Sequence, residues 1–382
     1  MSSKHIYIIS SNKWQSRTFN YLLKDLSLDK YKLSILNLRD QGLTEDIWSN
    51  LSGDNVVITD LSNIYKFENL NLLNSLRNFF SIRKEIQKII DSNTDESIVV
   101  TYDSFYRIYE LIILSCLSNT TAFIQFQHGL RTSHLGLKSL VRTPLSNLIR
   151  YCLFFLLGSV ANNNYRNILK RVPFYKINFN TKETKKNDYT SGNIQIAATI
   201  EELSKYSSKS DSTNILFLSS GAFRTNFDDM KLQTIESFQV ALNFCKTNNK
   251  KLFIKFKDDE KQNEFAHLLN DSQVTVIENN LDLVSTIKAV QPELVICHSS
   301  STTVAELALS GFKVASYDAI FPDYSDEYLN FYKKLNFLDI IDLKNETKFN
   351  SIEPNASAFL RSKLDLNEVD QMVLSKILTN LE

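Results

Sequence analysis

Short hydrophobic runs alternate along this chain with longer stretches in which apolar residues recur every three or four positions. In the first half the runs predict strands at 5–10, 32–36, 55–59, 97–102 and 122–126, and the periodic stretches predict helices at about 14–26, 70–90 and 105–117. The alternation restarts further on, with strands expected at 214–219, 251–256, 274–278, 294–297 and 313–317 and helices near 231–247, 260–269 and 281–290. Alternation of this kind is typical of parallel sheets covered by helices.

Two such series predict an α/β protein with two Rossmann-like, doubly wound domains that face a cleft. We expect an N-terminal domain at 1–205, a C-terminal domain at 206–365 and a helix at 366–382. The join is placed in the polar stretch 201–213, and the stretch 176–193, which is nearly as polar, is an earlier alternative. The last helix is amphipathic and could pack back on the N-terminal domain.

In doubly wound sheets the ligand binds beyond the carboxyl ends of the strands. In the second domain this rule selects polar and basic residues that follow the first two strands, namely Ser219, Ser220, Gly221, Arg224, Lys255 and Lys257. In the first domain it selects 10–12, 103–104 and 127–131. We therefore look for chemistry at these strand ends.

Residues 294–315 are read as strand, polar turn, helix and strand within 22 residues. The turn and helix start would surround an anion with hydrogen-bond donors, and the helix dipole adds attraction; the donor-binding candidates here are His298, Ser299, Ser300, Ser301 and Thr302. Glu306 could accept bonds from ribose hydroxyls. Alternatively, Thr303 and Glu306 form a capping box and the hydroxyls only satisfy the helix start.

His128 lies in a turn directly after the strand expected at 122–126, and Gly129 permits that turn to be tight. A neutral histidine there could take the proton of an incoming hydroxyl near pH 7. Asp103 ends the preceding strand and could orient His128 or bind the acceptor, or it could simply begin a helix. Gln127, Gly129 and Arg131 are the candidates for binding an acceptor. For His128 and Arg131 the structural alternatives are a turn-stabilising histidine and a solvated arginine.

Composition adds limits to this picture. With 382 residues, 43% hydrophobic and 23% charged, the chain reads as an ordinary globular protein, and no signal peptide opens it. The four cysteines are widely spaced without a CxxC pair, which argues against a zinc site or a disulfide framework. No metal is expected, because the pairs Asp228–Asp229 and Asp258–Asp259 are better explained as helix starts. We expect no nucleic-acid partner and a cytoplasmic location.

The zero net charge conceals a basic region. Residues 111–182 contain nine Lys and Arg and no Asp or Glu, and within them 148–160 is almost wholly apolar. Thirteen residues are too few to span a bilayer. The region either contacts anionic lipid at the inner face of the cytoplasmic membrane, through 131–182, or contains a buried helix with solvated arginines.

Together these residues resemble a GT-B glycosyltransferase. The segment from Glu306 to Val314, ELALSGFKV, is similar to the nucleotide-binding EAxAxGxPVV segment of that superfamily. The Gln-His-Gly turn at 127–129 and the His-Ser-Ser-Ser turn at 298–301 look most like those of bacterial capsule, teichoic-acid and sialic-acid-type polysaccharide transferases. One departure is Lys255-Phe256-Lys257, which stands where those enzymes usually carry a His-Pro pair.

The resemblance implies transfer of a sugar from a nucleotide-activated donor to a hydroxyl of a surface polysaccharide or lipid-linked glycan. It implies a metal-independent enzyme without a separate cofactor, with His128 as base, and inversion at the anomeric centre is the simpler expectation. Two alternatives are a UDP-sugar 2-epimerase, whose GDT and HVEAGLRT segments resemble 102–104 and 128–132, and a non-catalytic nucleotide-sugar-binding scaffold of a polysaccharide complex. The second acid and the Gly-Gly turn of the epimerases are missing.

Overall fold

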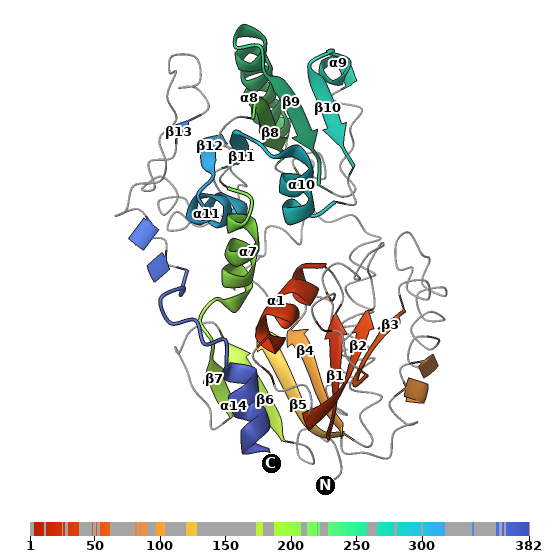
Figure 1. The fold of residues 1–382 in the computed structure, drawn as a ribbon. Coiled ribbons are helices and arrows are strands. Elements are labelled where there is room, and N and C mark those ends of the chain that lie inside the picture. Colours follow the sequence, from red (N-terminus) through yellow and green to blue (C-terminus); the bar gives the residue numbers. More distant parts are fainter. Residues whose placement is uncertain are drawn as a thin grey trace. The chain divides into compact units, whose positions relative to one another are not determined.

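The computed structural model describes residues 4–10, 13–24, 26, 30–37, 48, 51, 54–61, 81, 84–85, 87–89, 97–103, 120–127, 173–178, 187–207, 212–219, 221, 228–257, 266–278, 281–298, 301–317, 338–339, 357–358, 361–362 and 364–381. The chain divides into two compact units (Figure 1). Unit 1 comprises Met1–Gln195 and Asp365–Glu382, and unit 2 comprises Ile196–Leu364. Each unit is built around its own parallel sheet.

The sheet of unit 1 has seven strands in the order β3-β2-β1-β4-β5-β6-β7. They are β1 (Lys4–Ser10), β2 (Tyr31–Asn37), β3 (Val56–Asp60), β4 (Ser97–Asp103), β5 (Thr120–Gln127), β6 (Phe174–Asn178) and β7 (Asp188–Thr190). Every neighbouring pair runs parallel. The strand order reverses between β1 and β4, as it does in doubly wound sheets.

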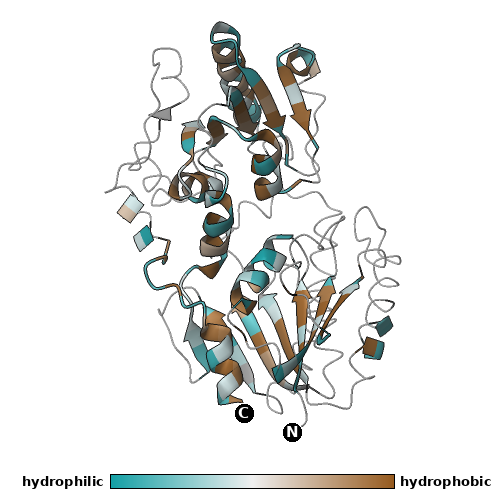
Figure 2. Ribbon diagram, viewed as in Figure 1, coloured by the Kyte–Doolittle hydropathy of each residue, from teal (hydrophilic) through white to brown (hydrophobic). Residues whose placement is uncertain are grey.

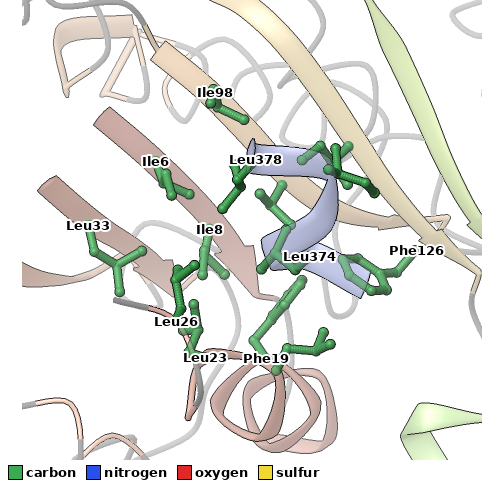
Figure 3. Packing of buried hydrophobic residues seen from close by; sticks show 14 of the residues in the cluster. Ile6, Ile8, Phe19, Leu23, Leu26, Leu33, Ile98, Phe126, Leu374 and Leu378 are labelled. Atoms are coloured by element: carbon green, nitrogen blue, oxygen red, sulfur yellow. The ribbon is translucent and has the colours of Figure 1, made fainter. Parts of the chain in front are cut away.

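One face of this sheet is covered by two helices from opposite ends of the chain. Helix α1 (Lys13–Leu23) and helix α14 (Val373–Asn380) pack on alternate residues of the strands, including Ile6, Ile8 and Ile98 (Figure 3). On α14, Leu374 and Leu378 are fully buried in this core. The C-terminal helix is therefore part of unit 1, although the whole of unit 2 precedes it in the sequence.

The returning segment is fixed to unit 1 by close backbone contacts. Asn193 N donates to Asp365 O at 2.9 Å, and Asp370 N donates to Ser191 O at 2.9 Å. Gly192 has φ +63°, and a Cβ at this position would lie 2.7 Å from Asp365 O and 2.8 Å from Glu368 O. Glycine is required here because both the backbone angle and the close approach exclude a side chain.

The sheet of unit 2 has the order β10-β9-β8-β11-β12-β13. Its strands are β8 (Asn214–Leu218), β9 (Lys251–Lys255), β10 (Val274–Ile277), β11 (Leu294–His298), β12 (Lys313–Tyr317) and β13 (Leu338–Asp339). Numbered within the unit, this is the order 3-2-1-4-5-6 of dinucleotide-binding sheets. The reversal of strand order falls between β8 and β11.

Both faces of this second sheet are buried. Helix α8 (Asp228–Thr247) packs on one face with Phe217 and Ile296, and the opposite face is covered by α7 (Ile194–Ser204), α10 (Leu283–Val290) and α11 (Thr302–Leu309) with Leu216 and Val295. Burial on both faces explains why these strands read as continuous apolar runs. Figure 2 shows the contrast between largely hydrophobic strands, in brown, and helices interrupted by hydrophilic residues, in teal.

The prediction of α/β units with doubly wound sheets is confirmed. Several elements differ from the sequence prediction: β6, β7, β13 and α7 were not predicted, and α9 (Ala266–Leu269) is described only over the last four residues of its expected range. Residues 201–204, predicted to start a linker, are the end of α7. The polar stretch considered as an earlier join contains the end of β6 and all of β7, which are short and lack a strong apolar pattern.

Candidate functional site

The carboxyl ends of β8, β9 and β11 bring together several of the predicted donor-binding residues. Ser219 and Gly221 follow β8, Lys257 follows β9, and His298 ends β11. Because β8 and β11 are the neighbours at which strand order reverses, loops leave this point toward opposite faces of the sheet, which is where doubly wound sheets bind ligands. The site below is confined to unit 2.

Backbone hydrogen bonds fix this edge. Ser219 N donates to Lys255 O at 3.0 Å, and Ser301 N donates to His298 O at 3.1 Å. Tyr317, the last residue of β12, donates from its hydroxyl to Leu218 O at 3.0 Å and stacks on Phe217 with 5.0 Å between ring centroids. The ends of β8, β9 and β11 are thus held by contacts that do not depend on a ligand.

Lys257 is the exposed residue of the site, and it lies against the buried Gly221. Gly221 has φ +82°, and a Cβ there would lie 2.9 Å from Cδ and 3.6 Å from Nζ of Lys257. The lysine side chain therefore lies along the glycine, and the residue as a whole is exposed. Lys255 differs, because its Nζ donates to Phe256 O at 3.3 Å. The two lysines of the Lys-Phe-Lys segment thus have different surroundings.

His298 lies beneath this surface, only 3% exposed, and its ring is 6.2 Å from that of Tyr317. Burial, with a further contribution from the charge of Lys257, lowers the pKa of His298 to about 3. The imidazole is therefore neutral at pH 7. It can take part in hydrogen bonding but cannot supply positive charge to an anion.

Helix α11 begins next to His298 and is capped by a serine of the predicted turn. Ser301 is the N-cap, with an extended backbone, and its side chain accepts from Thr303 N at 3.3 Å. The predicted capping box of Thr303 and Glu306 is wrong, because the helix starts at Thr302, one residue after the true cap. Thr302 itself is half-buried in the first turn.

Glu306 lies one turn further along α11 and is 7% exposed. Burial and, to a smaller extent, the charge of Glu306 raise the pKa of the Cys297 thiol far above its usual range, so Cys297 is inert. The effect of its charge on Cys297 also shows that Glu306 is close to the end of β11. Cys245 is also a buried free thiol. Asp228 begins α8, as expected of a helix-start aspartate.

Other predicted residues are only partly described or lie outside the described residues. Asp103 ends β4, as predicted, and Gln127, predicted to lie in the turn after the strand, is the last residue of β5; only their backbones are described. Outside the described residues lie His128, Gly129, Arg131, Ser220, Arg224, Ser299 and Ser300, together with 131–172 of the basic region.

Two further observations concern the part of the chain that the structure describes. Within it, no three or more His, Cys, Asp or Glu side chains are grouped so that they could hold a metal ion. None of its helices combines the length and the apolar character that crossing a membrane requires.

Neither a protein-family model nor a curated protein sequence matches this chain. Solved structures are similar over nearly the whole length: a UDP-N-acetylglucosamine 2-epimerase (11% identity, 99% of this chain and 96% of that chain, TM-score 0.53) and Glycyrrhiza uralensis UGT73P12 complexed with glycyrrhetinic acid 3-O-monoglucuronide (8% identity, 100% and 96%, TM-score 0.51). The Methanocaldococcus jannaschii UDP-GlcNAc 2-epimerase in complex with UDP-GlcNAc and UDP is also similar (14% identity, 99% of each chain, TM-score 0.49). The first two likenesses show the fold, which is of the GT-B type with two Rossmann-like domains.

Proposed function

We propose that the protein is a metal-independent GT-B glycosyltransferase. In this proposal unit 2 binds a nucleotide-activated sugar, which is transferred to a hydroxyl of a surface polysaccharide or lipid-linked glycan. The observation that carries the proposal is the convergence of Lys257, Gly221, His298 and the capped start of α11 at the reversal of strand order in unit 2. The fold, shared with a solved 2-epimerase and a solved UGT, supports it.

The donor phosphate is assigned to the start of α11 and Lys257. The first N–H groups of a helix and its dipole attract an anion. Lys257 adds a full positive charge, while neutral His298 adds only hydrogen bonding. Glu306, buried near the end of β11, remains the candidate for the ribose hydroxyls. The predicted residues Ser219, Ser220, Arg224, Lys255, Ser299 and Ser300 complete the proposed donor site.

The proposed reaction is a direct displacement. The acceptor hydroxyl, bound by unit 1 through Gln127, Gly129 and Arg131, loses its proton to His128 as its oxygen bonds to the anomeric carbon. The bond from that carbon to the phosphate oxygen breaks, and the nucleotide leaves with the electron pair. Asp103 orients His128, and a single displacement inverts the anomeric centre.

The first test concerns the lysine. In Lys257→Gln we expect the affinity for the nucleotide to fall about tenfold, because a charge-assisted contact of about 1.4 kcal/mol is lost. The donor is first identified by screening CMP-, CDP-, UDP- and GDP-sugars for thermal stabilisation. Lys288→Gln is the matched control, since Lys288 is an exposed lysine of the same unit on α10. Equal affinities in the two variants would remove Lys257 from the donor site.

The second test concerns transfer itself. His128→Ala is expected to abolish transfer while nucleotide binding is retained, because the base is needed only for the acceptor step. Retained transfer would exclude His128 as the base. A non-catalytic scaffold predicts instead that no transfer is detected in the unmodified protein.

A UDP-sugar 2-epimerase is the second candidate, favoured by the likeness of fold to a solved 2-epimerase. Incubation with a UDP-sugar and no acceptor separates the two activities. An epimerase converts the sugar under these conditions, whereas a transferase needs the acceptor. Proton NMR of the sugar nucleotide follows the conversion directly.

The acceptor class is linked to the basic region at 111–182. Its nine positive charges and apolar segment support contact with anionic lipid, where a lipid-linked acceptor would be found. In a co-sedimentation assay at low salt, we expect the protein to pellet together with vesicles of phosphatidylglycerol. If the protein is absent from the vesicle pellet, contact of the basic region with anionic lipid is contradicted, and a dissolved glycan becomes the expected acceptor.

A further inference from the structure

Unit 1 has its own reversal of strand order, and the polar residues there are not used by the proposed donor site. Ser10 ends β1 and Asn37 ends β2, and the two are partners in the parallel register. Register partners point to the same face of a sheet. Ile8 and Ile35 share that face and belong to the core under α1, so Ser10 and Asn37 face α1 as well.

These residues lie at the start of α1. Ser10 Oγ and Ser16 Oγ are 2.8 Å apart, and both side chains are completely buried. Helix α1 has 11 residues from Lys13, so its first N–H groups and the positive end of its dipole lie at this edge. The helix start therefore contributes positive potential at this edge.

Asn37 is the unusual member of the group. The residue is 1% exposed, and among the described residues its buried Oδ1 has no hydrogen-bond partner. Leaving such a group unpaired costs about 1–3 kcal/mol. Asn20 Oδ1 on α1 is also buried without a partner among the described residues, but only Asn37 lies at the end of a strand, where doubly wound sheets bind ligands, so its oxygen is placed to accept from a ligand.

The surroundings restrict the chemistry of that partner. The carboxamide oxygen is a hydrogen-bond acceptor and therefore cannot pair with an anion, which is also an acceptor. The negative charge of Asp60, the register partner of Asn37 on β3, makes an anion still less favourable. A cation is disfavoured by the start of α1. A neutral hydroxyl fits both conditions, and because it donates and accepts, it can pair with either end of the carboxamide.

We propose that the carboxyl ends of β1 and β2 bind a sugar ring through neighbouring hydroxyl groups, with Asn37 and Ser10 as the binding residues. In doubly wound sheets the end of the second strand is where ribose hydroxyls are held. The ring belongs either to the glycan acceptor or to a second nucleoside. The identification with the acceptor rests on the proposed function, whereas the site itself does not.

The test is binding of two probe sets to the full chain, measured by saturation-transfer NMR. Methyl glycosides of glucose, galactose and N-acetylglucosamine represent the acceptor, and uridine and adenosine represent a nucleoside. We expect a glycoside to bind, and Asn37→Leu to weaken it at least about tenfold, the equivalent of one hydrogen bond to a buried group. Asn20→Leu is the matched control: Asn20 also has a buried Oδ1 without a partner among the described residues, but it lies within α1 and not at a strand end, so this variant is expected to bind normally.

Thermal unfolding without ligand provides the second readout. Asn37→Leu is expected to raise the unfolding temperature, because it removes an unpaired buried polar group. If Asn37→Leu does not fold, Ser10→Ala replaces it as the test variant, and we expect Ser10→Ala to weaken glycoside binding as well. The proposal is overturned if no probe binds, if the Asn37→Leu and Ser10→Ala variants bind like the unmodified protein, or if Asn37→Leu lowers the unfolding temperature. If only a nucleoside binds, and its binding depends on Asn37, the sugar-ring site is supported but its ligand is not the acceptor. None of these results depends on transfer activity.

Discussion

Gly221 positions Lys257 through the absence of a side chain. In Gly221→Ala, φ +82° becomes unfavourable by about 1–2 kcal/mol, and the new Cβ displaces the lysine stem. We expect a lower unfolding temperature together with weaker nucleotide binding by titration calorimetry. Gly311→Ala separates the two effects, because Gly311 has φ +89° but its Cβ would only touch Ser207 Oγ at 3.4 Å. If both variants lose nucleotide affinity equally, Gly221 does not act through Lys257.

His298 links stability to pH. The unfolded chain takes up a proton on this histidine near pH 6.5, whereas the folded protein does so only near pH 3. Between these values the unfolded state binds more protons, so stability is fully present above pH 6.5 and falls as the pH is lowered. The slope approaches about 1.4 kcal/mol per pH unit. Urea unfolding from pH 7.5 to 5 should show a smaller slope in His298→Gln, and an unchanged slope would mean that His298 is protonated in the folded state.

Helix α14 contributes to the stability of unit 1 through its buried leucines. Leu374→Ala is expected to lower the free energy of unfolding by about 2–5 kcal/mol, because Leu374 is fully buried against the sheet (Figure 3). Met372→Ala is the control, since Met372 is 40% exposed next to the same helix. Circular dichroism during urea unfolding measures both. Similar losses in the two variants would contradict the packing of α14.

At the level of elements, the sequence predicted those strands and helices whose hydrophobic residues recur in a clear pattern. Ten strands and helix α8 lie close to their expected ranges, because most of these strands are buried and strongly apolar. It did not predict β6 and β7, which are short and only partly buried, or α7, which contributes residues to two cores. It also placed the cap of α11 at Thr303, since adjacent serines and threonines are equivalent until the helix start is known.

The candidate site shows the same limit. The strand-end rule selected Ser219, Lys257 and His298 from sequence, and the structure places them at one edge. Which lysine lies along Gly221, and that His298 is buried and neutral, depend on side-chain packing that no local pattern encodes. Asn37 was missed, although a polar residue closing the apolar strand at 31–37 is the signal that could have found it.

For the whole molecule, the proposed donor site predicts where a ligand slows amide exchange. Saturating nucleotide should protect 214–221 and 294–309 of unit 2, because the bound phosphate stabilises the strand ends and the start of α11. Hydrogen exchange followed by mass spectrometry measures this across the chain. Protection confined to the strands of unit 1 would contradict the assignment of the donor to unit 2.

The return of the chain to unit 1 determines the order in which a growing polypeptide can finish its two cores. Unit 2 is one continuous stretch, so all its strands are available once residue 364 has been synthesised. The core of unit 1 still lacks Leu374 and Leu378 at that moment, although its first strand was made long before. Domains usually fold from the N-terminus during synthesis. Here the unit that begins first is completed last, so a chain truncated before residue 374 would leave the N-terminal sheet with part of its hydrophobic face uncovered.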